Sequence, residues 1–392
     1  MENKKIIIKR ILKILLLAAA VLLSVYGLQE YVVKPWDSSD QRITGFYMEP
    51  ENSLDVVLMG ASDVHYDFSS CRAYGEFGYT SYPFSCHQST IGVWQTQVDE
   101  IMRTQSPAVI VIEINGALYM DEPVHSDENL RFFTNNMPNG ASKDSLIEAY
   151  SDIYEPGERM SYYIPFLKYH GNLRDLGEAY SRAMERISLR LRGRTRLKGE
   201  TTILGTARPG HVLDMTYEYG PLPLDPSHEE VLVSFLDHCR ERDIPLLFIR
   251  SPHIIEEGDK KNIGRFHMTD RVAEIVAKYG YELIHFDRLH GEIGLDETRD
   301  FLDSDHLNLY GKEKFTDALS AYLLDRFPIE GRTHSQDVTA AWDESLAYYR
   351  QYREDMESDY ANGREENFGL YTSESRALID KLSAELEKKP AP

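Results

Sequence analysis

The chain has 392 residues, of which 42 % are hydrophobic and 27 % are charged, and its formal net charge is −21. These proportions are typical of a globular protein with one large domain, or one domain plus additions, and the acidic balance argues against a nucleic-acid partner because a polyanion would be repelled. Three cysteines are too few for a disulfide framework or a zinc site, so we expect buried thiols, with a single Cys71–Cys86 bridge as the alternative.

The first segment of the chain is a candidate membrane anchor. Basic residues up to Lys13 precede Ile14 to Leu28, a run without a charged residue. With its apolar flanks this run is long enough for a helix that crosses a hydrocarbon core of ~30 Å. A cleaved secretory signal is the alternative interpretation. We favour an uncleaved anchor over residues 1–33, with the basic flank inside and the rest exported, and we interpret residues 34–53 as a linker.

Apolar runs that alternate with amphipathic segments predict a parallel sheet covered by helices. The predicted strands are Leu54–Met59, Tyr79–Cys86, Ala108–Ile114, Ile244–Arg250 and Tyr281–Phe286. The third is the most continuous apolar run and should be central. Apolar residues at steps of three and four around Trp94, Leu236, Val276 and Leu319 predict the helices. We therefore expect an α/β fold, a three-layer α/β/α sandwich around a parallel sheet, over residues 54–328.

Two regions fall outside this alternation. Residues 119–226 contain many aromatic residues, glycines and prolines, and we expect an insertion that caps the carboxyl edge of the sheet. Its basic segment, residues 182–198, is expected to be a solvated helical face, with contact to anionic lipid or a polyanionic wall polymer as the alternative. Residues 329–392 predict a helical C-terminal extension, with Trp342 and Tyr349 on one face.

The sequence around Ser62 has the form in which an α/β protein presents a nucleophile. The apolar run Val56–Met59 stops at Gly60, and the hydroxyl follows at the carboxyl edge of the sheet. Far downstream, Asp303 precedes His306 by three residues, just before the last core helix. A serine needs a base to take its proton, an imidazole suits that task near neutral pH, and a carboxylate orients the imidazole. We expect these three side chains to meet as a catalytic triad.

These two stretches resemble the first and last sequence blocks of the SGNH/GDSL hydrolases. Gly-Ala-Ser62 follows the first strand, and the Asp303/His306 pair precedes the terminal helix. The resemblance covers residues 54–115 and 229–327 and implies the three-layer fold and ester hydrolysis or acyl transfer without a metal or other cofactor. The α/β-hydrolases are a weaker alternative, because the second glycine of their Gly-x-Ser-x-Gly elbow is absent here.

The same resemblance implies an oxyanion hole with three donors. These are the backbone N–H of Ser62, a backbone N–H in the second loop, and an asparagine after the third strand. Asn115 stands directly behind the third predicted strand. The usual glycine of the second loop is missing, so a backbone N–H near Gln88 is the expected donor there, since any residue except proline has one.

Three further side chains are weaker candidates for the lining of a substrate cleft, namely Asp63, His65 and His253. For His253 an ordinary hydrogen-bonded or surface histidine is the alternative. Asp63, His65 and Asp67 alternate, so in an extended segment they would share one side and, with the carboxylates of the downstream loop, could hold a divalent metal. A metal-dependent hydrolase is therefore a third hypothesis, although we expect no metal at this site.

One N-terminal anchor, an exported domain, a large insertion and Asp-His-Leu-Asn near the end resemble the superfamily members of teichoic-acid D-alanylation and polysaccharide O-acetylation. This resemblance implies an acylated envelope glycan or teichoic-acid-like polymer as substrate, a membrane-bound O-acyltransferase as a candidate partner, and a catalytic domain on the extracytoplasmic side of the cell membrane. The sequence leaves open whether water or a sugar hydroxyl accepts the acyl group. A non-catalytic module that binds glycan or the acyltransferase is the second hypothesis.

Overall fold

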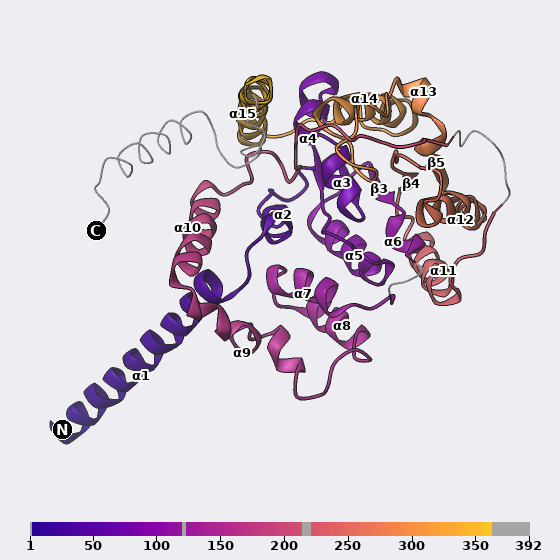
Figure 1. Cartoon of the computed structure of the whole chain (residues 1–392). Helices are drawn as coiled ribbons and strands as arrows, with labels where there is room; N and C mark the ends of the chain where they lie inside the picture. Colours follow the sequence, from indigo (N-terminus) through magenta and orange to yellow (C-terminus); the bar gives the residue numbers. More distant parts are fainter. Residues whose placement is uncertain (1, 120–122, 214–220, 363–392) are drawn as a thin grey trace, which may run out of the picture.

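The computed structural model describes residues 2–119, 123–213 and 221–362 (Figure 1). Its centre is a parallel sheet with the strand order β2-β1-β3-β4-β5. The strands are β1 (Val56–Met59), β2 (Ser81–Pro83), β3 (Val109–Glu113), β4 (Leu246–Arg250) and β5 (Glu282–His285). All five predicted strands are present, and β3 is central. The first four are buried on both faces, which explains the largely apolar sequences of β1, β3 and β4.

Helices cover both faces of this sheet. One face carries α5 (Trp94–Thr104), α11 (Pro226–Arg240) and α12 (Lys260–Ala277), and the other carries α3 (Ser62–Asp67) and α14 (Leu309–Arg326). Alternate strand residues enter the two cores, as Val57 does on the α5 side and Val56 on the α14 side. The predicted three-layer α/β/α arrangement is therefore confirmed. Short helices complete the connections: α4 (Ser70–Arg72), α6 (Asn115–Leu118) and α13 (His290–Ile293).

The prediction of a linker over residues 34–53 was wrong. This segment contains α2 (Ser38–Phe46), which begins at a capping box formed by Asp37. The ring of Phe46 is buried and stacks on Phe84 with 4.0 Å between the centroids. The segment belongs to the domain because its few apolar side chains lie one helical turn apart and join the main core.

The insertion between β3 and α11 is largely helical. Its longer helices are α7 (Asp127–Asn136), α8 (Ala141–Ala149) and α10 (Leu176–Arg192), and α9 (Phe166–Tyr169) is a short one. Leu130 and Ile147 join the same core as α5, so the insertion packs on the domain (Figure 1). Asn129 of α7 donates to the carbonyl of Gln88 at 3.0 Å, which brings the insertion to the loop after β2 at the carboxyl edge of the sheet.

The basic segment is not a uniformly solvated face. Arg182 and Arg186 of α10 are buried. Arg186 Nη2 donates to the carbonyl of Pro35 at 2.6 Å, and its guanidinium lies 4.2 Å from the ring centroid of Trp36. The expectation of a solvated face was wrong for these two residues. Arg186 holds α10 against the chain that follows the N-terminal helix, and Arg182 donates to the carbonyl of Asn172 at 3.4 Å within the insertion.

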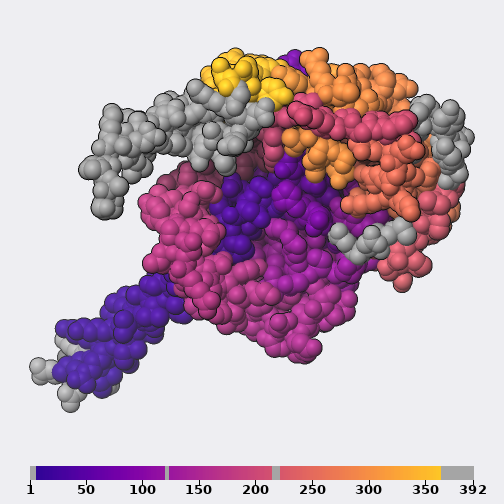
Figure 2. Space-filling model, viewed as in Figure 1, coloured from indigo at the N-terminus to yellow at the C-terminus, as the bar shows by residue number. Residues whose placement is uncertain are grey.

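The N-terminal helix projects from the rest of the molecule. Helix α1 (Glu2–Leu28) continues as one turn of π-helix over Gln29–Val33. Among the described residues, one helix, Ile6–Val33, is long and apolar enough to cross a membrane, and no part of its most apolar window is buried. Figure 2 shows this helix standing clear of the globular part. The length and composition agree with the predicted anchor.

The last described helix is α15 (Gln336–Ala361). Trp342 and Tyr349 are buried on its inner face, as predicted, and residues 363–392 of the predicted extension lie outside the described residues. The three cysteines are free and buried, so the alternative of a Cys71–Cys86 bridge was wrong.

Candidate active site

The structure brings Ser62, His306 and Asp303 together. The Oγ of Ser62 lies 2.9 Å from Nε2 of His306, although the two residues are 244 positions apart. The other ring nitrogen, Nδ1, lies 3.0 Å and 3.1 Å from the two carboxylate oxygens of Asp303. This arrangement suits a ring whose Nδ1 donates to the carboxylate and whose Nε2 accepts from the serine hydroxyl.

The backbone at Gly60 explains how the serine reaches this position. Gly60 has a φ of +144°, and a Cβ built on it would lie 2.8 Å from the carbonyl oxygen of Glu113 on the neighbouring strand. Only glycine fits this turn without strain. Ser62 is then the first residue of α3 and is half-buried.

The loop that carries His306 is held by its own hydrogen bonds. Asp303 accepts from the backbone N–H groups of Asp305 at 2.8 Å and His306 at 2.9 Å. Asn308 caps α14 by accepting from the N–H of Tyr310 at 3.0 Å. The carboxylate is therefore oriented before it meets the imidazole, although its side chain is 52 % exposed.

Negative charges surround the imidazole. Burial alone would lower the pKa of His306, but the hydrogen bond to Asp303 and the charges of Asp63 and Asp67 raise it to about 9. Burial raises the pKa of the Asp303 carboxyl, yet the contact with His306 brings it below its ordinary value. The ring of Tyr66 packs against the imidazole with 4.5 Å between the centroids. The site thus stabilises the imidazolium that forms when the serine gives up its proton.

Asp63, directly after the serine, belongs to a second buried chain of charges. Its Oδ1 accepts from Nε2 of His253 at 2.9 Å, and Nδ1 of His253 lies 3.0 Å from Asp287. Burial would lower the pKa of His253, and so would Arg250, but the two carboxylates raise it to about 10. With an acceptor on each ring nitrogen, His253 carries both protons and its charge is balanced on either side.

Asn115 joins this network at the carboxyl end of β3. Its Oδ1 accepts from Arg250, and its side-chain amide donates to Asp63, which contributes to the low pKa of that carboxyl. Among the described residues no hydrogen bond joins Asn115 to Ser62. Asn115, the predicted oxyanion donor, therefore lies beside Asp63, the residue after Ser62, and its amide is bonded to Asp63 and Arg250.

Two further predicted site residues, His65 and Gln88, lie in different surroundings. His65 is fully buried, its Nδ1 lies 2.9 Å from the hydroxyl of Ser85, and burial keeps its pKa well below the ordinary value. His65 thus lies behind the edge of the site and does not line a cleft. Gln88 is exposed in the loop after β2 with a φ of +49°. Its N–H makes no hydrogen bond within the part of the chain that the structure describes.

The segment expected to be extended is helical, which separates the proposed metal ligands. Asp63 turns to His253, His65 to Ser85, and Asp67 accepts from the backbone N–H of Leu307. Across residues 2–119, 123–213 and 221–362, no three His, Cys, Asp or Glu side chains are grouped so that they could hold a metal ion.

Sequence reasoning missed several side chains of this region. They are Glu113, Arg250 and Asp287 in the charge network and Tyr66 beside the imidazole, while Asp67 at the end of α3 was considered only as a metal ligand. The signal for the first three was available. Each stands at or just after the carboxyl end of a predicted strand, the edge at which Ser62 and Asn115 were sought. Burial raises the pKa of Glu113 to about 8, so this carboxyl is mostly neutral at pH 7.

Comparisons with known proteins do not identify the chain. No protein-family model matches it, and no curated protein matches it. Among solved structures, a native Bacteroidetes-affiliated GH5 cellulase linked with a polysaccharide utilization locus aligns over 79 % of this chain and 99 % of its own, with 10 % identity. Its TM-score of 0.18 is too low to indicate a common fold.

Proposed function

We propose that the chain is a serine esterase or O-acyltransferase of the SGNH type in which Ser62 is the nucleophile. The observation that carries the proposal is the hydrogen bond of 2.9 Å between Ser62 Oγ and His306 Nε2, with Asp303 on the other ring nitrogen. A serine, an imidazole and a carboxylate in this order form the arrangement by which unrelated folds activate a hydroxyl for acyl transfer.

The proposed reaction has two steps. In the first, Ser62 Oγ attacks the acyl carbonyl, His306 Nε2 takes the hydroxyl proton, and the tetrahedral intermediate collapses as the imidazolium returns the proton to the leaving oxygen. In the second, water or a sugar hydroxyl gives its proton to His306 and attacks the acyl-serine, and the imidazolium returns the proton to Ser62 Oγ as the acid or the new ester is released. Asp303 orients the ring and stabilises its positive form in both steps.

The developing oxyanion needs hydrogen-bond donors that are already in place. The backbone N–H groups of Ser62 and Gln88 are the proposed donors, and the Gln88 N–H is available because it makes no hydrogen bond to any residue that the structure describes. Asn115 is the third proposed donor, since its Nδ2 lies beside Asp63, the residue next to the nucleophile. A donor of this kind typically contributes ~2.7–4 kcal/mol to the transition state.

The anchor and the resemblance suggest where the chain acts. We propose that α1 tethers the domain to the cell membrane on the extracytoplasmic side, with an acylated envelope glycan or a teichoic-acid-like polymer as substrate and a membrane-bound O-acyltransferase as a partner. The apolar length of α1 supports the tether, and the basic residues before it favour this orientation. The proposal includes both water and a sugar hydroxyl as acyl acceptors.

Hydrolysis of an aryl acetate by the purified chain tests the proposal. We expect Ser62→Ala and His306→Ala to lose the activity, while the matched variant Ser106→Ala, which changes an exposed hydroxyl outside the triad, retains it. Equal rates in wild type and Ser62→Ala would remove the proposed nucleophile.

One observation favours a non-catalytic binding module as a second candidate. The Asn115 amide is engaged by Arg250 and Asp63, so one proposed oxyanion donor is not free. In this case the carboxyl edge would bind glycan or acyltransferase without forming an acyl-serine. Glycan binding that persists in a chain without any aryl acetate hydrolysis would support the second candidate over the first.

A further inference from the structure

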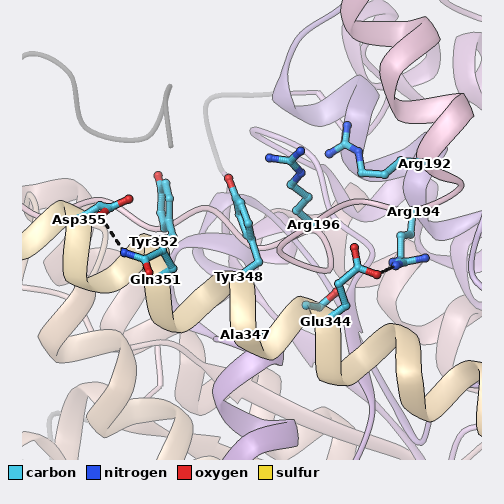
Figure 3. Close-up of a pocket in the computed structure, with 10 residues that line it drawn as sticks. Arg192, Arg194, Arg196, Glu344, Ala347, Tyr348, Gln351, Tyr352 and Asp355 are labelled. Atoms are coloured by element: carbon cyan, nitrogen blue, oxygen red, sulfur yellow. Dashed lines mark hydrogen bonds and ion pairs between the residues drawn. The ribbon is translucent and has the colours of Figure 1, made fainter. Parts of the chain in front are cut away.

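A pocket of about 480 Å³ lies between the end of α10 and helix α15, away from the triad. Arg192, Arg194 and Arg196 line it from the α10 side, and Tyr348 and Tyr352 line it from α15. Figure 3 shows Arg192 and Arg196 on one side of the space and the two tyrosine rings rising toward it from the helix below. These residues belong neither to the proposed triad nor to the buried charge network.

The positive charge of this pocket is only partly neutralised. Arg194 forms an ion pair with Glu344. Within the described part of the chain, Arg192 and Arg196 form no ion pair, and the guanidinium of Arg196 lies 4.9 Å from the ring centroid of Tyr348. Burial, and then the charge of Arg196, lowers the pKa of Arg192, as expected for cations held together without a full set of anions. The lining thus holds three arginines and two carboxylates, Glu344 and Asp355, and Asp355 accepts from Gln351 at 3.0 Å. In a chain with a net charge of −21, a cavity with this excess of arginine is an anion-binding feature.

The aromatic side of the pocket has a defined geometry. Tyr348 and Tyr352 are one helical turn apart, and their rings are stacked with centroids 6.1 Å apart and planes inclined by 18°. Their hydroxyls add donors and acceptors at the rim. An aromatic face next to polar groups suits the flat, C–H-bearing face of a sugar ring.

We propose that this pocket binds a phosphorylated sugar. The phosphate would accept hydrogen bonds from Arg192 and Arg196 together, since its tetrahedral oxygens can meet two guanidinium groups. The sugar ring would lie against Tyr348 and Tyr352. Binding at this pocket requires no chemistry at Ser62.

A second pocket adjoins the first and is lined by a residue that contacts the surroundings of the triad. Its volume is about 300 Å³, it shares Arg192, Arg196, Tyr348 and Tyr352 with the first, and it extends to Ser38. The hydroxyl of Ser38 lies 3.3 Å from Nε2 of His87, whose ring is 6.4 Å from that of Tyr66, the residue packed on His306. The phosphorylated sugar would then be one unit of a longer substrate whose acyl group reaches Ser62, a step that rests on the proposed function.

Calorimetric titration of the full-length chain in detergent with glucose 1-phosphate tests the proposal. We expect wild type to bind this probe, and Arg192→Gln/Arg196→Gln to bind it at least about tenfold more weakly. Arg326→Gln is the matched control, because Arg326 also lies over a tyrosine ring, at 5.6 Å from the centroid of Tyr322, but outside the pocket. Affinity should fall as salt is raised.

Two further probes separate the sugar from the phosphate. Glucose should bind far more weakly than glucose 1-phosphate, and glycerol 3-phosphate, which resembles a lipid headgroup, should bind more weakly because it has no ring to stack. Tyr348→Leu should remove most of the preference for glucose 1-phosphate over glycerol 3-phosphate.

The proposal is overturned if wild type does not bind glucose 1-phosphate, if the double variant binds as tightly as wild type, or if glycerol 3-phosphate binds as well as glucose 1-phosphate. The first and third results need no variant, so misfolding cannot produce them. Ser62→Ala should bind glucose 1-phosphate like wild type. Binding without aryl acetate hydrolysis would therefore contradict the proposed reaction alone, and hydrolysis without binding would contradict the sugar-phosphate site alone.

Discussion

Asp67 accepts a hydrogen bond from the backbone N–H of Leu307 at 2.8 Å, across 240 positions of sequence. Asp67 ends the helix that begins at Ser62, and Leu307 follows His306 directly. This one bond joins the segment of the proposed nucleophile to the loop of the proposed base. Burial, followed by the charge of Asp63, raises the pKa of the Asp67 carboxyl to about 8.

Asp67→Ala should misplace the imidazole relative to Ser62. We expect kcat/KM for aryl acetate hydrolysis to fall by about 100-fold, because a displacement of about 1 Å has an effect of that order on an aligned reaction. Asp67→Asn keeps an oxygen that accepts from Leu307 N–H and should retain most of the activity. Similar losses in the two variants would show that this hydrogen bond does not position His306.

The pH dependence of hydrolysis should be displaced to the alkaline side. His306 accepts a proton only when neutral, and its pKa is raised to about 9, so kcat/KM should increase with pH and level off above that value. Asp67→Asn removes one of the neighbouring negative charges and should move the midpoint to lower pH. A midpoint near the ordinary histidine value of about 6.5 in wild type would contradict the electrostatic account of His306.

Asp303→Asn should lower kcat much more than it changes KM. The amide can present an acceptor to Nδ1 but cannot stabilise the imidazolium by charge, and the loss expected for such a group is about 100-fold or more. Asp305→Asn, in the same loop, is the matched control, since Asp305 contributes its backbone N–H to Asp303 and its side chain bonds to Asn262. Steady-state kinetics of the two variants distinguish the effect of the Asp303 charge next to His306 Nδ1 from the effect of losing any carboxylate of this loop.

The second charge network should contribute mainly to stability. Asp287→Ala would leave Arg250 and His253 buried without their shared carboxylate, and we expect a loss of about 3–5 kcal/mol in the free energy of unfolding. Asp325→Ala, which removes the exposed partner of Arg326, should change it by less than about 1 kcal/mol. Urea denaturation measures both. A small effect of Asp287→Ala would mean that water replaces the lost carboxylate.

This network also predicts the sign of one pH effect. The pKa of His253 is raised to about 10 in the folded protein, above the value of about 6.5 expected when unfolded. Its stabilising contribution is therefore complete below pH 6.5 and is lost as pH rises to about 10. The unfolding free energy of wild type should fall more steeply over this range than that of His253→Gln. Parallel curves would contradict the assignment of a protonated His253.

Helix α2 should be part of the folding unit. Phe46→Ala removes a buried ring that stacks on Phe84, and the expected loss is about 3–5 kcal/mol. Tyr180→Ala, at an aromatic residue of α10 that is 67 % exposed, should lie within about 0.5 kcal/mol of wild type. Equal stabilities for the two variants would restore the interpretation of residues 34–53 as a linker.

The sheet and the triad contacts could be predicted because each depends on a local pattern. A parallel strand buried on both faces is a continuous apolar run, and Val109–Glu113 has that form. The carboxyl ends of such strands share one edge, so Ser62 and a histidine loop before the last helix are expected there. The pairing of Ser62 with His306 follows from this topology without knowledge of the strand order.

Other features depend on which strands are neighbours, which the sequence does not contain. The position of Asn115 after β3 could be predicted, but its contact with Arg250 could not, because it depends on β4 lying beside β3. Helix α2 was missed because Ser, Asp, Gln and Arg outnumber its apolar residues, and the burial of Phe46 depends on Phe84, which is distant in sequence. The segment after Ser62 was predicted to be extended because its polar and apolar residues alternate. The alternation covers too few positions to distinguish the period of a strand from that of a helix.

The most direct test of the central claim is covalent trapping of the proposed nucleophile. The full-length chain is treated with a fluorophosphonate, and the modified residue is located by peptide mapping with mass spectrometry. We predict a single adduct on Ser62, formed much more slowly in His306→Ala. No adduct, or an adduct on another serine with Ser62 unmodified, would contradict the assignment of Ser62 as the nucleophile.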